Sequence, residues 1–437
     1  MLRSFRVTNH RSLRNEQELL LMPAVESGAR VLPVAAVFGA NASGKSNLVD
    51  ALGWMDRAVQ SSYRSWEAES GVPRDPYRLD DVSAAEPSDF TVELILDGVQ
   101  VVYGFTADQD TVIEEWLHSY PDDERSVTFE RRGRTVEFGP AVRGGQDRAE
   151  LLGSLLRDNA LLLSTAVQAG QEDLLPVYRW FRDKLRILGS QRSWARTPGT
   201  VSARILEAAH RHPEFADLLR AADLGISGVE VVPSPEELDR ARHAARLLAA
   251  DSGTAQRQIA ETLLDDRRRA GQLKQEVNFL HGKDGRRLGL ADQSHGTLAW
   301  ADLLLAALSA LEAGAVLVID EIDASLHPRL TARLVELFRN DDTNRHQSQL
   351  VFTTHDATLL GSDLGDEEVL ARDEIWFVEK REGASALYPL SDFEGPEREH
   401  RESRYLAGSY GAVPALFTDT LVDSLRRNRT GSADAES

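Results

Sequence analysis

The feature that most constrains this chain is an apolar run that leads directly into a glycine-rich loop. Val34 to Phe38 reads as a short buried strand, and helical periodicity follows from Lys45 to Val59. Between them stands the segment Gly39-Ala40-Asn41-Ala42-Ser43-Gly44-Lys45-Ser46. It fits the pattern G-x-x-x-x-G-K-[ST] in its strand–loop–helix setting. Because glycines let successive backbone N–H groups point into one concavity at a helix start, the segment predicts a phosphate-binding loop in an α/β protein.

The side chains of this loop predict the ligand. Lys45 can reach the β- and γ-phosphates of a nucleotide, and the Ser46 hydroxyl can bind Mg²⁺. The sequence contains no Asn-Lys-x-Asp motif for guanine, so a GTPase is disfavoured. The predicted nucleotide-binding residues of the loop are Gly39, Ala40, Asn41, Ala42, Ser43, Gly44, Lys45, Ser46 and Asn47.

A second apolar run ends in two acids. Val316 to Ile319 has the continuous apolar character of a buried parallel strand, and Asp320 and Glu321 follow it. Ligands of α/β sheets gather at the carboxyl ends of strands. We expect Asp320 to hold Mg²⁺, directly or through water, and Glu321 to orient or deprotonate the attacking water. The simpler alternative, a strand followed by an acidic turn, is disfavoured by the upstream phosphate loop.

Three further segments occur in a fixed order around these acids. Leu290 to Thr297 precedes them, Ile322 to Pro328 follows directly, and Gln349 to Asp356 comes later. This order resembles the head of ABC-type ATPases, with Walker A, signature, Walker B, D-loop and switch histidine. More narrowly, it resembles bacterial AAA-type ATPases of the abortive-infection or RloA-like kind, which are relatives of the OLD, RecF and SMC heads.

The resemblance implies a fold and a mechanism. The fold would be an α/β P-loop NTPase of the ABC-ATPase-head type, with an antiparallel β-insert and a mostly helical insertion. Two subunits would sandwich two nucleotides, so that Ser294 and the Gly296 amide of one head face the γ-phosphate held by the other. His355 would contact the γ-phosphate or the attacking water, and would act in catalysis with Glu321 and Lys45. ATP binding would join heads into a homodimer or higher homo-oligomer, and hydrolysis would release them.

Simpler interpretations of several residues stay open. Ser294 could cap a helix, and an isolated histidine such as His355 is more often structural than catalytic. Arg11 stands where related heads bring an arginine near the nucleotide, but a surface role is equally compatible with its position. The glutamine of the Q-loop is not placed by any signature in the sequence.

The patterning divides the chain into lobes. Thr91 to Leu96 and Val99 to Phe105 alternate around Asp97-Gly98, which is a hairpin signal, and residues 150–275 read as mostly helical. The expected divisions are an N-terminal ATPase lobe with the β-insert at 1–145, a helical insertion at 146–284, a C-terminal ATPase lobe at 285–430 and a disordered tail at 431–437.

The resemblance implies the leading functional hypothesis, an ATP-hydrolysing switch that controls an effector in anti-phage defence. OLD-type relatives carry their own Toprim nuclease, which needs a Glu and an Asp-x-Asp on strand ends after the ATPase. No such set fits the residues after His355. The effector is therefore expected to be a separate polypeptide, a nuclease in the simplest case. A transport cassette is a third choice, because those are usually shorter.

The charge bears on the alternative, a RecF/SMC-like DNA-binding repair or maintenance ATPase. The chain has 50 Lys and Arg against 70 Asp and Glu, a net charge of −20, which argues against a protein coated in positive charge. Any DNA contact is expected to be local. Candidate contacts are Arg182, Lys184, Arg186, Arg192, Arg196, Arg267, Arg268, Arg269 and Lys274.

The sequence also predicts a cytoplasmic protein without membrane contact. It has no cysteine, as suits a reducing compartment. Its first ten residues contain no apolar core of a signal peptide. The most apolar stretch, Leu303 to Ile319, is interrupted by Glu312 and Gly314, whereas a membrane span needs about 20 apolar residues.

Overall fold

The structure is a computed structural model, and it describes most of the chain. The described residues are 1–24, 31–189, 205–206, 211–212, 214–222, 225–234, 239, 275–324, 326–361, 368–394 and 400–414. The predicted tail at 431–437 lies outside them, as do Ser325 of the D-loop segment and the basic candidates from Arg192 onwards.

A six-stranded sheet forms the centre of the molecule, in the order β16-β15-β3-β14-β13-β9. Its strands are β3 (Val34–Phe38), β9 (Leu185–Leu188), β13 (Val316–Ile319), β14 (Gln349–Thr354), β15 (Ile375–Arg381) and β16 (Ala384–Pro389). All neighbours pair in parallel except β15 and β16, which form an antiparallel hairpin. The carboxyl ends of β3, β9, β13, β14 and β15 therefore lie at one edge of the sheet.

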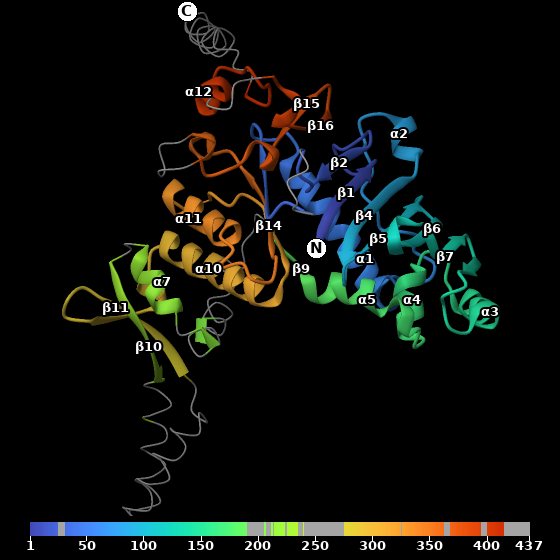
Figure 1. Ribbon diagram of the computed structural model, residues 1–437, viewed down its shortest axis with the longest axis horizontal. Helices are drawn as coiled ribbons and strands as arrows, with labels where there is room; N and C mark the ends of the chain where they lie inside the picture. The colour runs from blue at the N-terminus through green and yellow to red at the C-terminus, as the bar shows by residue number, and fades with distance from the viewer. Residues whose placement is uncertain are drawn as a thin grey trace, which may run out of the picture.

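Alternation along β3 shows how this sheet is buried on both faces. Ala35 and Val37 belong to one hydrophobic cluster, whereas Val34, Ala36 and Phe38 belong to a second. Because successive strand residues point to opposite faces, the sheet separates two cores. The first core includes helix α1 (Lys45–Ser65), and the second includes α10 (His295–Ala313) and α11 (Pro328–Arg339), which lie together in Figure 1.

A seven-stranded antiparallel sheet covers the α1 side, in the order β2-β1-β4-β5-β6-β7-β8. Its strands are β1 (Leu2–Thr8), β2 (Gln17–Leu20), β4 (Ser88–Leu96), β5 (Val99–Ala107), β6 (Val112–Tyr120), β7 (Ser126–Arg132) and β8 (Thr135–Phe138). The hairpin predicted at Asp97-Gly98 joins β4 to β5. Strands β1 and β2 precede the phosphate loop, so the layer is larger than the insert that the sequence predicts.

Short helices complete this lobe, at the right of Figure 1. They are α2 (Asp81–Ala85), α3 (Gly145–Leu155), α4 (Leu162–Gln168) and α5 (Leu175–Arg179), followed by a π-helical turn at Trp180–Lys184. Residues 146–284 also contribute strands that the sequence patterning does not predict. Strand β9 pairs with β13 in the central sheet, and β10 (Ile226–Pro233) and β11 (Gln275–His281) join β12 (Arg286–Gly289) in a small sheet beside α7 (Phe215–Ala221).

The fold class is the predicted one, a P-loop α/β fold with an antiparallel β-layer. Near the C-terminal end of the described residues, α12 (Arg401–Leu406) packs its Tyr405 ring against Phe38 and Phe377 of the central sheet. Helix α10 alone among the described helices is long and apolar enough to cross a membrane, but 67% of its apolar window is buried inside the protein. A buried core helix passes the same test, so this is weak evidence for a membrane span.

Candidate nucleotide-binding site

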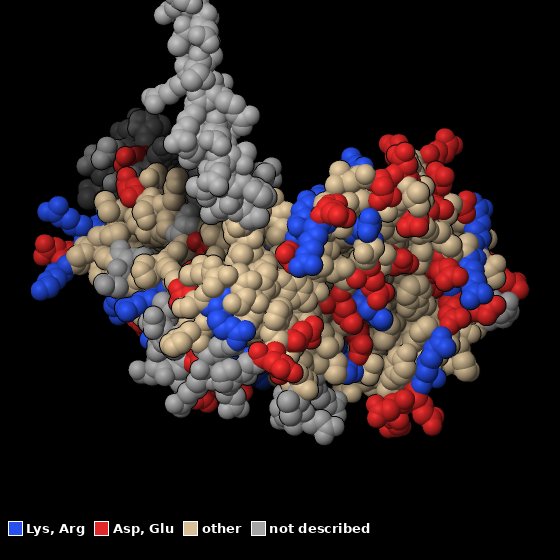
Figure 2. Space-filling model, turned by 90° about the horizontal axis from the view of Figure 1, so that it is seen from above, with Lys and Arg blue, Asp and Glu red and all other residues tan. Residues whose placement is uncertain are grey.

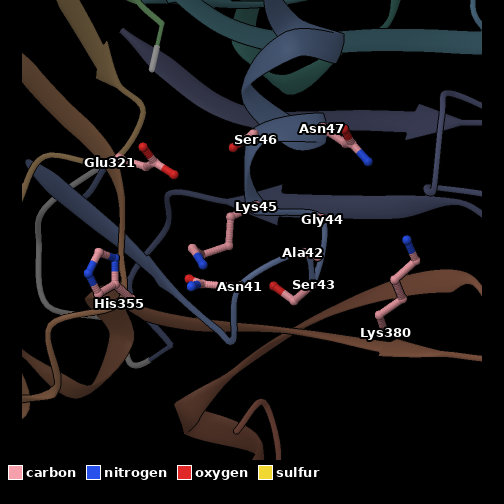
Figure 3. A pocket seen from close by; sticks show the side chains of 10 residues that line it. All are labelled: Asn41, Ala42, Ser43, Gly44, Lys45, Ser46, Asn47, Glu321, His355 and Lys380. Carbon is pink, nitrogen blue, oxygen red and sulfur yellow. The ribbon is translucent and has the colours of Figure 1, made fainter. Parts of the chain in front are cut away.

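The glycine-rich loop connects β3 to α1 at the carboxyl edge of the central sheet, as Figure 3 shows. A Cβ atom at Gly39 would lie 2.5 Å from the Val378 carbonyl oxygen on β15. Gly44 has a φ of +113°, in the left-handed region that favours glycine. The two glycines therefore allow the loop to pack closely on its neighbours while its backbone curls around a cavity.

That cavity has a volume of about 410 Å³ and gathers most of the predicted site. Figure 3 shows Lys45 and Asn41 near its centre, Glu321 and His355 on one side, and Lys380 of β15 on the opposite side. Its lining residues are Asn41, Ala42, Ser43, Gly44, Lys45, Ser46, Asn47, Glu321, His355 and Lys380. The structure thus brings together residues from four separate parts of the sequence, as expected where several strands end at one edge.

Lys45 and Ser43 give the cavity the character of an anion site. The Lys45 ammonium donates to the carbonyl oxygens of Gly39 at 2.7 Å and Ala40 at 3.1 Å. Burial lowers the pKa of Lys45, and the acidic side chains around it, Asp323 first, oppose that shift. The Ser43 hydroxyl is buried and has no hydrogen-bond partner among the described residues. A buried hydroxyl without a partner beside a cation and loop amides fits the oxygen acceptors of a phosphate.

The two acids are held by one threonine. The Thr353 hydroxyl at the end of β14 donates to Asp320 Oδ1 at 2.6 Å and accepts the Glu321 N–H at 2.7 Å. Glu321 has a φ of +53°, which is uncommon for a residue other than glycine. The bond from Thr353 therefore helps to hold a strained backbone that turns Glu321 away from the strand and into the cavity.

Asp320 meets the phosphate loop directly. The Ser46 hydroxyl at the start of α1 donates to Asp320 Oδ1 at 3.2 Å, and Asp320 is buried. Two oxygen atoms this close together could both be ligands of Mg²⁺, which usually binds one or two protein oxygens and completes its coordination shell with water and phosphate. Among the described residues no group of three or more His, Cys, Asp or Glu side chains could hold a metal ion, so any ion here would share its ligands with the nucleotide.

His355 follows β14 and enters the cavity from the side of Glu321 (Figure 3). Its Nδ1 atom lies 3.0 Å from Asp323 Oδ2 in the turn after β13. The Asp323 side chain is 6% exposed, whereas that of His355 is 57% exposed. The ring is therefore fixed on its inner side and accessible on its outer side, where a ligand in the cavity would lie.

The predicted signature residues lie elsewhere. Ser294 caps α10 by accepting the Thr297 N–H at 3.1 Å, and it is exposed. Ser294 and Gly296 do not line the cavity around Lys45. Within one chain the structure does not bring them to the phosphate loop, so a role at a nucleotide would require the site of a second chain.

Arg11 has two acidic partners. Its guanidinium donates to Asp75 at 2.9 Å and lies 3.2 Å from Asp50 on α1. It lines a neighbouring cavity of about 390 Å³ that shares Asn47 and Lys380 with the first. Arg11 therefore lies close to the site, and its charge is already compensated.

Sequence patterns did not single out Thr353 or Lys380 as part of the site. Thr353 contacts Asp320, which lies 33 residues away in the sequence. Lys380 lies near the end of β15, and nothing in the sequence of that strand marks it as part of a site. The one available signal was the position of Thr353 at the end of a buried strand adjacent to the one that carries Asp320.

Together, the loop, the acids and the strand order define a P-loop nucleotide-binding protein. A family model described as "AAA domain, putative AbiEii toxin, Type IV TA system" matches residues 34–166 and 192–361. The chain belongs to this family of AAA domains. None of the curated proteins that were compared with the chain matches it.

Solved structures of SMC heads are similar at low identity. An SMC head bound to the C-winged helix domain of ScpA is 14% identical with a TM-score of 0.41, over 89% of this chain and 96% of that one. The SMC head domain from Thermotoga maritima is 15% identical with a TM-score of 0.40, over 89% and 98%. An Smc head with an extended coiled coil, bound to the C-terminal domain of ScpA derived from Pyrococcus furiosus, is 12% identical with a TM-score of 0.38, over 90% and 97%.

Proposed function

We propose that this chain is an ATP-hydrolysing switch that dimerises through its nucleotide sites and controls a separate effector in anti-phage defence. The observation that carries the enzymatic part is the contact of 3.2 Å between Ser46 and Asp320. It joins the phosphate loop to the acidic strand end, and Glu321 and His355 line the same cavity. Membership of an AAA family supports ATP as the nucleotide.

Each side chain has a part in the proposed reaction. Lys45 and the loop amides bind the phosphates, and Ser46 with Asp320 would hold Mg²⁺, which when bound supplies positive charge to the phosphate oxygens. Glu321 orients and deprotonates the attacking water, and His355 contacts that water or the γ-phosphate. Lys45 and the loop N–H groups would stabilise the negative charge on the phosphate oxygens during phosphoryl transfer.

Dimerisation is the second part of the proposal. Ser294 and Gly296 stand at the start of α10, where backbone N–H groups and the helix dipole favour an anion. Ser294 is exposed and lies outside its own chain's cavity, which supports a contact with a nucleotide bound by a second copy. ATP held between two heads would favour the closed dimer, and its hydrolysis would release it.

The effector and the compartment are proposals of the same kind. The family description names a putative toxin of a type IV system, which supports a role in controlling growth or defence. We propose a separate effector polypeptide, a nuclease in the simplest case, and a cytoplasmic location.

A DNA-binding repair ATPase is less well supported. The candidate DNA-contacting residues that the structure describes already have partners within the chain. Arg182 pairs with Asp183, Lys184 donates to the Ala313 carbonyl oxygen, and Arg186 donates to the Ser309 hydroxyl. On the face shown in Figure 2, basic and acidic side chains are interspersed. Neither observation supplies the basic groove that DNA binding requires.

Phosphate release from ATP tests the enzymatic part of this function. We expect the purified chain to release phosphate from ATP in the presence of Mg²⁺. Lys45→Ala should lose ATP binding, because the buried ammonium is removed from the cavity. Glu321→Gln should bind ATP as tightly as the wild type, while its rate of hydrolysis falls about 100-fold or more, the scale expected for loss of a general base.

Two results would contradict the assignment. Wild-type protein that binds no ATP would refute the nucleotide site, and Glu321→Gln protein that hydrolyses ATP at the wild-type rate would refute the base. Melting curves of both variants without nucleotide serve as the control for folding.

A further inference from the structure

Two buried serines support the outer side of the phosphate loop. Ser12 lies between β1 and β2, and Ser385 lies on β16, next to Gly44. The Ser385 N–H donates to the Ser12 carbonyl oxygen at 2.7 Å. A Cβ atom on Gly44 would collide with Ser385 and lie 2.8 Å from Ser12 Oγ. Glycine at this position therefore admits a contact with both serines.

The hydroxyl groups form a chain whose direction follows from counting protons. Ser385 Oγ lies 2.5 Å from the Ser43 carbonyl oxygen and 2.7 Å from Ser12 Oγ. A carbonyl can only accept, so the single Ser385 proton goes to Ser43. The bond between the two hydroxyls then takes its proton from Ser12, which itself accepts from the Asn47 amide at 2.6 Å. The chain thus runs from the first turn of α1 back to the loop carbonyl.

The geometry of the peptide bond gives this chain a consequence for the ligand. In a planar trans peptide the C=O and N–H groups point in opposite directions. Ser385, which donates to the Ser43 carbonyl, is not among the residues that line the cavity, so this carbonyl is held away from the cavity and the N–H of Gly44 in the same peptide unit points towards it. Gly44 and Ser43 both line the cavity, and the Ser43 hydroxyl has no partner among the described residues.

We propose that Ser385 is a positioning residue that aims the Gly44 N–H at a bound phosphate. The inference rests on the proposed function of the site, and it adds a residue from the β15–β16 hairpin, 342 positions away from Ser43 in the sequence. Without the Ser385 hydroxyl, the buried Ser43 carbonyl loses its donor and the peptide is free to rotate. The loop then has to be ordered by the ligand, which weakens binding.

Equilibrium binding of ATP and of inorganic pyrophosphate to Ser385→Ala tests the proposal. We expect both dissociation constants to rise about tenfold, the scale of one lost hydrogen bond to a buried group. The kcat for ATP should stay within about threefold of wild type, since Ser385 does not contact the reacting atoms. The double variant Ser12→Ala/Ser385→Ala should bind no more weakly than Ser385→Ala, because the two hydroxyls act through one bond.

Ser348→Ala is the matched control. Ser348 is also a buried serine that donates to a backbone carbonyl, that of Ala310 at 2.9 Å, but it lies outside the site. It should lower the melting temperature as Ser385→Ala does, with no change in either dissociation constant.

The outcomes separate this proposal from the function on which it rests. Unchanged dissociation constants in Ser385→Ala, with a lowered melting temperature, would make Ser385 purely structural and overturn the proposal. Wild-type protein that binds pyrophosphate but not ATP would overturn the proposed function, while weaker pyrophosphate binding by Ser385→Ala would still support the role of Ser385. Binding of neither ligand by the wild type would overturn both.

Discussion

At the scale of single residues, the site depends on a few groups whose conformation or burial is costly. Glu321 has a left-handed backbone at φ +53°, and the Ser43 hydroxyl is buried without a hydrogen-bond partner among the residues that the structure describes. Strain and unpaired groups of this kind cluster at functional sites, where a ligand or a neighbouring bond compensates for them. For Glu321 the compensating bond comes from Thr353.

Thr353→Val tests that bond, because valine has the shape of threonine without the hydroxyl. Asp320 and the Glu321 N–H would both lose a partner. We expect kcat for ATP hydrolysis to fall about tenfold or more, with a smaller change in the dissociation constant of ATP, because loss of a supporting bond mainly misplaces the acids. The measurement is steady-state hydrolysis together with equilibrium ATP binding.

Thr354→Val is the control for that prediction. The Thr354 hydroxyl accepts the Asp356 N–H at 3.0 Å and contacts neither acid. The kcat of the Thr354→Val variant should stay within about threefold of wild type, because Thr354 does not support the reacting groups. Equal losses in the two variants would show that Thr353 acts only through packing.

The site residues that sequence patterns predict belong to local motifs, whereas the residues that these patterns miss act through contacts with distant segments. The run from Gly39 to Ser46 is local, since glycine, lysine and serine are each required within one turn. Asp320 and Glu321 were found because a buried strand ends at them. Thr353 and Ser385 contribute through hydrogen bonds to distant segments, and a hydroxyl that bonds far along the chain leaves no periodic or local pattern.

At the scale of elements, the antiparallel sheet is tied to the helical part of its lobe by a buried charge pair. Arg131 on β7 lies 3.2 Å from Glu115 on β6, and both side chains are fully buried. Glu115 also accepts the N–H groups of Leu162 and Leu163 at the start of α4. Burial raises the pKa of Glu115, and the Arg131 charge and the two N–H groups oppose that rise. The pair therefore anchors α4 to the sheet.

Arg131→Met should destabilise the protein by about 3–5 kcal/mol, since it leaves a buried carboxylate without its counter-charge. The double variant Glu115→Gln/Arg131→Met should regain part of that loss, because the remaining amide still accepts a backbone N–H. Urea unfolding measures both. As a control, Arg134→Met breaks the exposed pair with Asp158 and should cost less than about 1 kcal/mol. If the losses of unfolding free energy caused by Glu115→Gln and by Arg131→Met simply add up in the double variant, the two side chains do not act as a pair, and this would contradict their role as an anchor.

Sequence patterns predict some strands and helices accurately and miss others, and the difference has a physical reason. Strands β3 and β13 have strong apolar runs, and their predicted bounds agree with the structure. Strand β9 is four residues long and contains Arg186, so its strand form depends on pairing with β13. The division of the chain at residues 145 and 284 remains a proposal, and β9 shows that the middle range contributes to the central sheet.

At the scale of the whole molecule, the central sheet separates two cores and places the carboxyl ends of five parallel strands at one edge. A net charge of −20 is compatible with a phosphate ligand because the cation and amides are confined to one cavity of about 410 Å³. The exposed start of α10 lies outside that cavity. In the function that we propose, a complete site needs two chains, and nucleotide controls their association.

The mass of Glu321→Gln protein in solution tests this account most directly, by size-exclusion chromatography with light scattering. With ATP and Mg²⁺ we predict twice the chain mass of 48.3 kDa, and with ADP or no nucleotide the mass of one chain. Adding Ser294→Arg, which places a bulky side chain at the start of α10, should leave the protein monomeric with ATP. A mass that does not respond to ATP, or a dimer that survives Ser294→Arg, would contradict the account.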